Sequence, residues 1–239
     1  RHLAETIFSV PQKRTQKPLI GFLYPEEILK LFHVVNLKRK EGPRDYALLH
    51  LLFDSGARAT EVATLNLDDF NPEQKTLAIL GKGNRFRLIE LEPRTTQLLQ
   101  LYISRFRSSP KPPFQQRLFV NQRGEELTRY GIYRLCRKYL HLALPPKRLQ
   151  VIHPVHSFRH SCAVNMLARG NSTAEIKNRL GHENVQSTMT YLNLDLTLRR
   201  HIQKGFIHYM QSVITLDPKI EELLQWESDK DMIAWLDNL

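Results

Sequence analysis

The chain has 239 residues, 41% of them hydrophobic and 25% charged, which suits a globular protein with one substantial core. No apolar run reaches the roughly 18 residues that cross a bilayer, so we expect no membrane partner. Its two cysteines, Cys136 and Cys162, argue against a disulfide framework and favour a reducing compartment. The net charge of +11 indicates a polyanionic partner, most simply nucleic acid, although a generic basic protein remains the alternative.

The first third of the chain is predicted to be helical after a linker. Residues 9–18 are polar and basic and contain two prolines, as is typical of linkers. Pro25 and the apolar spacing behind it predict a helix over 24–35. A strongly apolar stretch, 45–56, predicts a buried helix that ends at Gly56. A further short helix is expected from residue 59, with Thr60 as its N-cap.

The hydrophobic period then changes from helical to alternating. Residues 75–80 and 85–91 are predicted to be strands joined by a tight turn, "GKGN", at 81–84. In the second strand Arg85 and Arg87 alternate with Phe86 and Leu88. We therefore expect one antiparallel hairpin.

The remaining elements are predicted to be mostly helical. Thr128 and the pair Ser172–Glu175 have the pattern of helix N-caps, and Gly181 that of a helix stop. A short strand and turn are expected over 117–127. The expected helices cover residues 94–106, 128–142, 156–170, 172–181 and, briefly, 187–194.

These elements predict a mainly α fold with a small antiparallel β-hairpin or sheet (α+β). We expect residues 1–18 to be the linker from an N-terminal domain, 19–204 to be one domain, and 205–239 to be an acidic helical tail. Residues 216–239 hold seven acidic and two basic side chains, a net of −5, so the rest carries about +16. Trp226 and Trp235 lie in this tail.

Three histidines and an arginine are clustered in "HPVHSFRHSCAVNML" (153–167). A zinc site usually has three or four ligands, often paired, and His156 and His160 have suitable spacing on a helix. However, the nearby Arg159 would repel a dication. A phosphate site fits better, because His156 and Arg159 are neighbours at a helix start, where backbone N–H groups favour anions. A solvated helix end is the simplest alternative.

Three more stretches carry candidate residues. "DSGARATEVATLNLDDF" places Arg58 after a glycine turn, with Glu61 three residues later. "LGKGNRFRLIEL" places Lys82 in the hairpin turn. "RLGHENVQSTMTYLNL" places His182 after Gly181, with Tyr191 nine residues further on. In this order, over about residues 20–195, the motifs G-x-R-x-x-E, G-K-G, H-x-x-R-H, L-G-H and Tyr resemble the tyrosine recombinase/integrase family.

The resemblance implies the fold of that family's catalytic domain and a role for each matched residue. Tyr191 would attack a scissile DNA phosphate, and Arg58 and Arg159 would hold its non-bridging oxygens. His182 would donate a further hydrogen bond, and Lys82 would protonate the leaving 5′-oxygen. His156 would assist proton transfer from the tyrosine, and Glu61 would orient Arg58 or His156.

This set of residues is chemically sufficient without a cofactor. Fixed cationic donors stabilise the negative charge that gathers in the phosphoryl transition state. A tyrosine with a reference pKa of about 10 needs a base and cationic surroundings, and the 5′-alkoxide needs an acid. A covalent 3′-phosphotyrosine stores the bond energy. We therefore expect neither metal, cofactor nor ATP.

The expected partner is double-stranded DNA. The resemblance also implies a tetramer that synapses two DNA sites, with residues 205–239 docking on a neighbouring subunit; docking of the tail on its own basic face is the alternative. A bacterial or mobile-element protein of the cytoplasm is implied. Candidate phosphate contacts, which are also explained by surface solvation, are Arg85, Arg87, Arg129, Arg134, Arg137 and Lys138.

The role would be DNA integration, transposition or resolution. Two other functions remain open. A type IB topoisomerase-like enzyme would relax DNA with the same chemistry, and a non-catalytic DNA-binding protein would keep only the fold. The L-G-H…Tyr spacing favours the recombinase over the first, and the intact set of catalytic candidates argues against the second.

Overall fold

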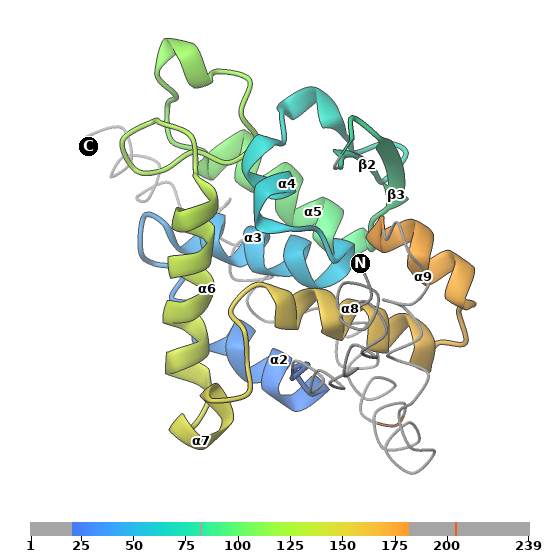
Figure 1. Ribbon diagram of the computed structural model, residues 1–239. Helices are drawn as coiled ribbons and strands as arrows, with labels where there is room; N and C mark the ends of the chain where they lie inside the picture. Colours follow the sequence, from blue (N-terminus) through green and yellow to red (C-terminus); the bar gives the residue numbers. More distant parts are fainter. Residues whose placement is uncertain (1–20, 82, 182–203, 205–239) are drawn as a thin grey trace, which may run out of the picture.

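Helix α3 (Gly42–Ser55) is the centre of the fold, and nearly all of its residues are buried. The computed structural model describes residues 21–81, 83–181 and 204. Helices α5 and α8 pack along α3 (Figure 1). The helices around α3 are α2 (Pro25–His33), α4 (Ala59–Thr64), α5 (Pro93–Leu101), α6 (Arg129–Ala143), α7 (Pro146–Leu149), α8 (His156–Ala168) and α9 (Thr173–Leu180). Shorter helical turns are η1 (Leu67–Asp69), η2 (Tyr102–Phe106) and η3 (Pro112–Phe114).

A single three-stranded antiparallel sheet stands beside the described helices. Its strands β1 (Phe70–Asn71), β2 (Thr76–Leu80) and β3 (Phe86–Glu90) pair in that order, so β3 is an edge strand. Leu80 pairs with Phe86 and Ile79 with Arg87 across the hairpin. The hairpin and the mainly α fold class are thus confirmed, and the two-residue strand β1 is an addition to the prediction.

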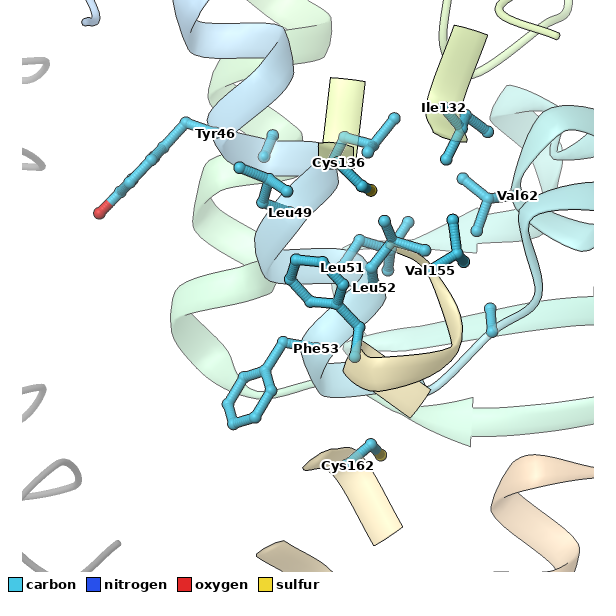
Figure 2. Packing of buried hydrophobic residues seen from close by; sticks show 14 of the residues in the cluster. Tyr46, Leu49, Leu51, Leu52, Phe53, Val62, Ile132, Cys136, Val155 and Cys162 are labelled. Atoms are coloured by element: carbon cyan, nitrogen blue, oxygen red, sulfur yellow. The ribbon is translucent and has the colours of Figure 1, made fainter. Parts of the chain in front are cut away.

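The core is built where helices distant in sequence meet. Figure 2 shows Leu49, Leu51 and Leu52 of α3 gathered with Val62 of α4 and Ile132 of α6. All five side chains are at most 1% exposed. Burying one such side chain stabilises a fold by about 1.5–3 kcal/mol, so this cluster fixes α4 and α6 against α3. Both α4 and α6 also supply residues to the site described below.

The predicted caps can be compared with the structure one by one. Gly56 and Gly181 end α3 and α9 in the left-handed conformation, with φ of 61° and 64°. The Thr128 hydroxyl accepts the Gly131 N–H at 3.2 Å, and Ser172 caps α9 in the same way. These caps are confirmed. The expectation of Thr60 as an N-cap is wrong, because the N-cap of α4 is Arg58, two residues earlier.

Two predicted elements differ in extent. The helix expected over 94–106 is α-helical only to Leu101 and continues as the π-helical turn η2. The strand expected in 117–127 is reduced to isolated bridges, Asn66 with Arg117 and Val120 with Glu126. Both differences are in short segments that do not form a long ladder of hydrogen bonds.

Some expectations fall outside the described residues. These are the linker 1–18, the helix 187–194, and the tail 205–239 with its two tryptophans. In the described part of the chain, no helix is long and apolar enough to cross a membrane. Cys136 and Cys162 are both free and buried.

Candidate active site

A pocket of about 470 Å³ lies where the start of α4, the first turns of α6 and the start of α8 meet. Its wall carries three arginines, two histidines and two tyrosines. They are Arg58, Arg129, Tyr130, Tyr133, His153, His156 and Arg159. Three of these side chains, Arg58, His156 and Arg159, were predicted from the sequence to be catalytic, and they come from segments about 100 residues apart.

Arg58 is held at the pocket by the glycine turn before it and by the helix after it. Gly56 ends α3 in the left-handed conformation, and Arg58 is the N-cap of α4 with extended backbone. The Arg58 backbone N–H donates to Oε2 of Glu61 at 2.9 Å, and its Nη1 donates to Oε1 at 2.8 Å. Because Glu61 holds both ends of the residue, the guanidinium is fixed while 37% of the side chain stays exposed to the pocket.

Arg159 is the buried counterpart of Arg58. It is 5% exposed, and its Nη1 donates to the Gly56 carbonyl at 2.7 Å. Its Nη2 donates to the Leu180 carbonyl at 2.6 Å. The planar fork therefore joins the carboxyl ends of α3 and α9, whose last carbonyls lack helical partners. A Cβ at Gly56 would lie 2.5 Å from Cδ2 of Leu180, so this approach requires glycine there.

His156 begins α8 at the rim of the pocket, in an exposed position. Partial burial lowers its pKa below 6.5, and the positive charges of His153, Arg159 and Arg58 add to the effect. Its ring lies 4.7 Å from that of His153. At neutral pH the imidazole is therefore uncharged, and an uncharged imidazole can accept a proton. One turn on, burial and His156 lower the pKa of His160 to about 4.

Glu61 is a buried anion surrounded by arginine donors. It is 5% exposed, and burial alone would raise its pKa. The hydrogen bonds from Arg87 and Arg58 outweigh burial and lower the pKa below 4.5. Glu61 is therefore a carboxylate at neutral pH, and the position expected to orient Arg58 does contact Arg58 directly.

Arg87 lies on the inner face of β3 rather than with the exposed side chains. Its side chain is 11% exposed, with Nη1 and Nη2 donating to the two Glu61 oxygens at 3.1 and 2.7 Å. Nε donates to the Arg179 carbonyl at 2.9 Å. The alternation in β3 is as predicted, but the solvent face is the one with Phe86 and Leu88. Arg87 thus differs in position from the other residues expected to contact DNA phosphates.

The other candidates for phosphate contacts are exposed. Arg85 precedes β3, and the remaining four lie along α6. Arg129 stacks over the Tyr130 ring at 4.6 Å and lines the pocket. Contact with DNA stays a prediction for Arg85, Arg129, Arg134, Arg137 and Lys138.

Three residues that complete the constellation lie outside the described residues: Lys82, His182 and Tyr191. Gly81 and Gly181, which directly precede Lys82 and His182 in the chain, are described. In the ranges 21–81 and 83–181, no group of three or more His, Cys, Asp and Glu side chains could hold a metal ion. The described pocket holds cationic and aromatic groups instead.

Sequence reasoning missed the aromatic wall of the pocket. Tyr130 and Tyr133 are three residues apart on α6, and the His153 ring meets Tyr133 at 5.9 Å between centroids. The i, i+3 spacing in a helix capped by Thr128 was a usable signal, because it places both tyrosines on one face near the helix start.

Comparison with known proteins identifies the family to which this fold belongs. Residues 21–197 match the phage integrase family, so the chain belongs to that family. It is 32% identical over 192 residues to tyrosine recombinase XerD of Staphylococcus haemolyticus, covering 80% of this chain and 64% of that protein. It is 31% identical to tyrosine recombinase XerC of Bacillus subtilis, covering 79% and 62%. The chain thus spans just under two thirds of these relatives.

Solved structures agree with the family assignment. XerA recombinase has a TM-score of 0.63 at 23% identity, over 77% of this chain and 64% of that one. XerH, solved with its difH substrate, has a TM-score of 0.62 at 25% identity, over 77% and 54%. The Tn1549 transposon integrase, solved with circular intermediate DNA, has a TM-score of 0.61 at 20% identity, over 78% and 66%. The similarity covers most of the described fold.

Proposed function

We propose that this chain is the catalytic part of a site-specific DNA recombinase that cuts and rejoins strands through Tyr191. The observation that carries the proposal is the meeting of Arg58, His156 and Arg159 at one pocket. These come from positions that match the family's motif, and membership of the family supports the same chemistry. Double-stranded DNA is the proposed substrate, and the structure of the site-specific recombinase XerH bound to its difH substrate supports this proposal.

In the proposed reaction, the Tyr191 hydroxyl oxygen attacks the scissile phosphorus. A new P–O bond to tyrosine forms as the bond to the 5′-oxygen breaks, and the tyrosine proton passes to neutral His156. Lys82 supplies a proton to the departing 5′-oxygen. Attack by a 5′-hydroxyl from another strand reverses these steps and releases the tyrosine. No net oxidation occurs, and no nucleotide is consumed.

The described geometry suits the charge that develops in this reaction. The pentacoordinate phosphate gathers negative charge on its non-bridging oxygens, and the exposed guanidinium of Arg58 is fixed beside the pocket before substrate enters. Preorganised donors of this kind typically contribute about 100-fold to 1,000-fold each. Arg159 forms the inner wall of the same pocket and adds positive charge there.

The test uses duplex DNA from the flanks of the gene, with a sulfur replacing the bridging 5′-oxygen at candidate cleavage positions. Sulfur leaves without an acid and rejoins poorly, so covalent adducts accumulate. We expect an SDS-resistant protein–DNA band in EDTA that is absent with Tyr191→Phe. A band that persists in Tyr191→Phe would show that another residue is the nucleophile.

The sulfur substrate also tests the acid. Lys82→Ala should cleave the sulfur substrate at close to the wild-type rate and the ordinary phosphodiester far more slowly, since only oxygen needs protonation. If both substrates lose rate equally, Lys82 is not the acid.

Strand exchange between two marked duplexes then separates a recombinase from an enzyme that only relaxes supercoils, and cleavage itself excludes a binding-only protein.

We further propose that the protein acts on DNA in the cytoplasm of a bacterium or from a mobile element there. Its bacterial relatives support this proposal. We propose a tetramer on DNA with residues 205–239 docking on a neighbour. Removing these residues should abolish assembly; tighter DNA binding by a monomer would instead indicate that the tail covers its own basic face.

A further inference from the structure

We propose that Arg87 is a positioning residue for cleavage. It joins three segments, each of which carries or adjoins a catalytic candidate. This inference rests on the proposed function, since it concerns the same pocket. Arg87 is not among the residues that line the described pocket, and it contacts Glu61 and the backbone of α9. The structure thus assigns it a role other than a phosphate contact.

The first link runs from Arg87 through Glu61 to Arg58. The Arg87 fork donates to both Glu61 oxygens, and Glu61 in turn accepts from the Arg58 backbone and guanidinium. A carboxylate held in a fork cannot rotate without breaking two hydrogen bonds, so its remaining lone pairs stay aimed at Arg58. Loss of Arg87 frees that rotation and with it the Arg58 guanidinium.

The second link runs to the end of α9. Arg87 Nε donates to the Arg179 carbonyl, and Arg159 takes the next carbonyl, that of Leu180. A Cβ at Gly181 would lie 2.9 Å from Nη1 of Arg87, so the guanidinium packs directly against this glycine. The chain leaves α9 through Gly181 toward His182. Arg87 therefore sets where that exit begins.

The third link is the hairpin turn itself. A Cβ at Gly81 would lie 3.4 Å from Nη1 of Arg87 and 3.7 Å from Oε1 of Glu61. The Gly81 N–H donates to the Arg85 carbonyl at 2.9 Å, and this hydrogen bond joins the two ends of the turn. Gly81 directly precedes Lys82. The guanidinium of Arg87 thus contacts Glu61, which supports Arg58. It also packs beside Gly81 and Gly181, the chain neighbours of Lys82 and His182.

The test measures adduct formation by wild-type protein, Arg87→Met and Arg87→Lys at saturating protein. Lysine keeps the charge but cannot donate to both Glu61 oxygens and to the Arg179 carbonyl together. The matched control is Arg148→Met, because Arg148 forms a similar fork on Glu27 far from the pocket. We expect about 100-fold slower cleavage for Arg87→Met, an intermediate rate for Arg87→Lys, and little change for Arg148→Met.

Two substrates separate positioning from general weakening of the fold. A methylphosphonate at the scissile position lacks the anionic oxygen that Arg58 would stabilise, so it should reduce the rate defects of both Arg87→Met and Arg58→Ala. The bridging-sulfur substrate should reduce any part of the Arg87→Met rate defect that arises through Lys82. Rescue by either substrate supports the proposal. A defect that neither substrate changes, or no defect at all, overturns it. If Arg87→Met does not fold, Arg87→Lys is judged by the same criteria.

Failure of the proposed function is recognised separately. Wild-type protein that forms no Tyr191-dependent adduct refutes the function, and crystal structures then decide the role of Arg87. A displaced Arg58 guanidinium and α9 end in the Arg87 variant support the positioning role. Unchanged positions of both overturn it.

Discussion

Two glutamates in this chain are held in the same way, one beside the pocket and one far from it. Glu61 and Glu27 each occupy the third position of a helix and accept the N–H of the N-cap residue, at 2.9 and 2.8 Å. Each also receives a two-pronged fork from a distant arginine, Arg87 or Arg148. Figure 1 shows these sites apart, at β3 and α4 in one case and at α2 and α7 in the other.

The two sites differ in what the N-cap residue does. At Glu27 the N-cap is Tyr24, whose ring packs under the guanidinium of Arg148 at 5.0 Å. At Glu61 the N-cap is Arg58, whose own guanidinium donates a further hydrogen bond to Glu61 and faces the pocket. The same set of hydrogen bonds thus stabilises the start of α2 in one case and fixes the catalytic candidate Arg58 at α4 in the other. The predictions below separate these two uses.

The largest expected effect is that of Glu61→Gln on DNA cleavage. The neutral amide offers one acceptor oxygen in place of two anionic ones, so Arg87 and Arg58 lose their shared partner. We expect adduct formation to slow by about 100-fold or more. Glu27→Gln, the matched change, should leave the rate within about 3-fold. Equal rates of adduct formation for Glu61→Gln and Glu27→Gln would show that the two sites do not differ in their effect on cleavage.

The next effect is on stability, where the two sites should look alike. Arg148→Met and Arg87→Met each remove hydrogen bonds to a carboxylate, which contribute about 1.5–3 kcal/mol. We expect urea unfolding to show losses of about 2 kcal/mol for both. A much larger loss for Arg87→Met would mean that its effect on cleavage reflects unfolding rather than positioning.

A smaller effect is expected in the pH dependence of stability. The pKa of Glu61 is lowered in the folded state, so its contribution is present above the unfolded value of 4.5. That contribution is lost as pH falls below 4.5 through the lower folded value. Unfolding free energies of wild type and Glu61→Gln should therefore converge as the pH drops below 4.5. A difference that stays constant through this range would contradict the assignment.

The smallest expected effect is that of His153→Gln on the pH profile of cleavage. Removing the His153 charge should raise the pKa of His156, because that charge helps to lower it. The neutral base then disappears at a higher pH, so the acid limb of the rate profile should move upward. Arg148→Met should leave that limb in place. An unmoved limb in His153→Gln would show that His156 is not the titrating base.

Much of the fold was readable from the sequence because its signals are local. Gly56, Gly181, Thr128 and Ser172 act through hydrogen bonds within a few residues, and each was predicted in its place. Arg58, His156 and Arg159 were found by motif rather than by geometry, since nothing local to them shows that they share a pocket.

The role of Arg87 was not readable in this way. The alternation of β3 told which residues share a face, but not which face is covered. That depends on Glu61, 26 residues earlier, and on the Arg179 carbonyl, 92 residues later. Phe86 and Leu88 face solvent because nothing in the described part of the chain packs over them, whereas α4 and α9 close over Arg87. Thr60 is not the cap for a simpler reason: Glu61 accepts the Arg58 N–H, so the N-cap is Arg58, two residues before Thr60.

The two acceptors of Arg159 have a consequence for protein synthesis. One lies 103 residues before it in the chain and the other 21 residues after it. A growing chain therefore carries the end of α3 for 103 residues before its partner Arg159 is made, and long-range contacts of this kind form late. Arg159 gains its second acceptor, the Leu180 carbonyl, only once α9 has been made. We therefore expect unfinished chains to lack the proposed cleavage activity.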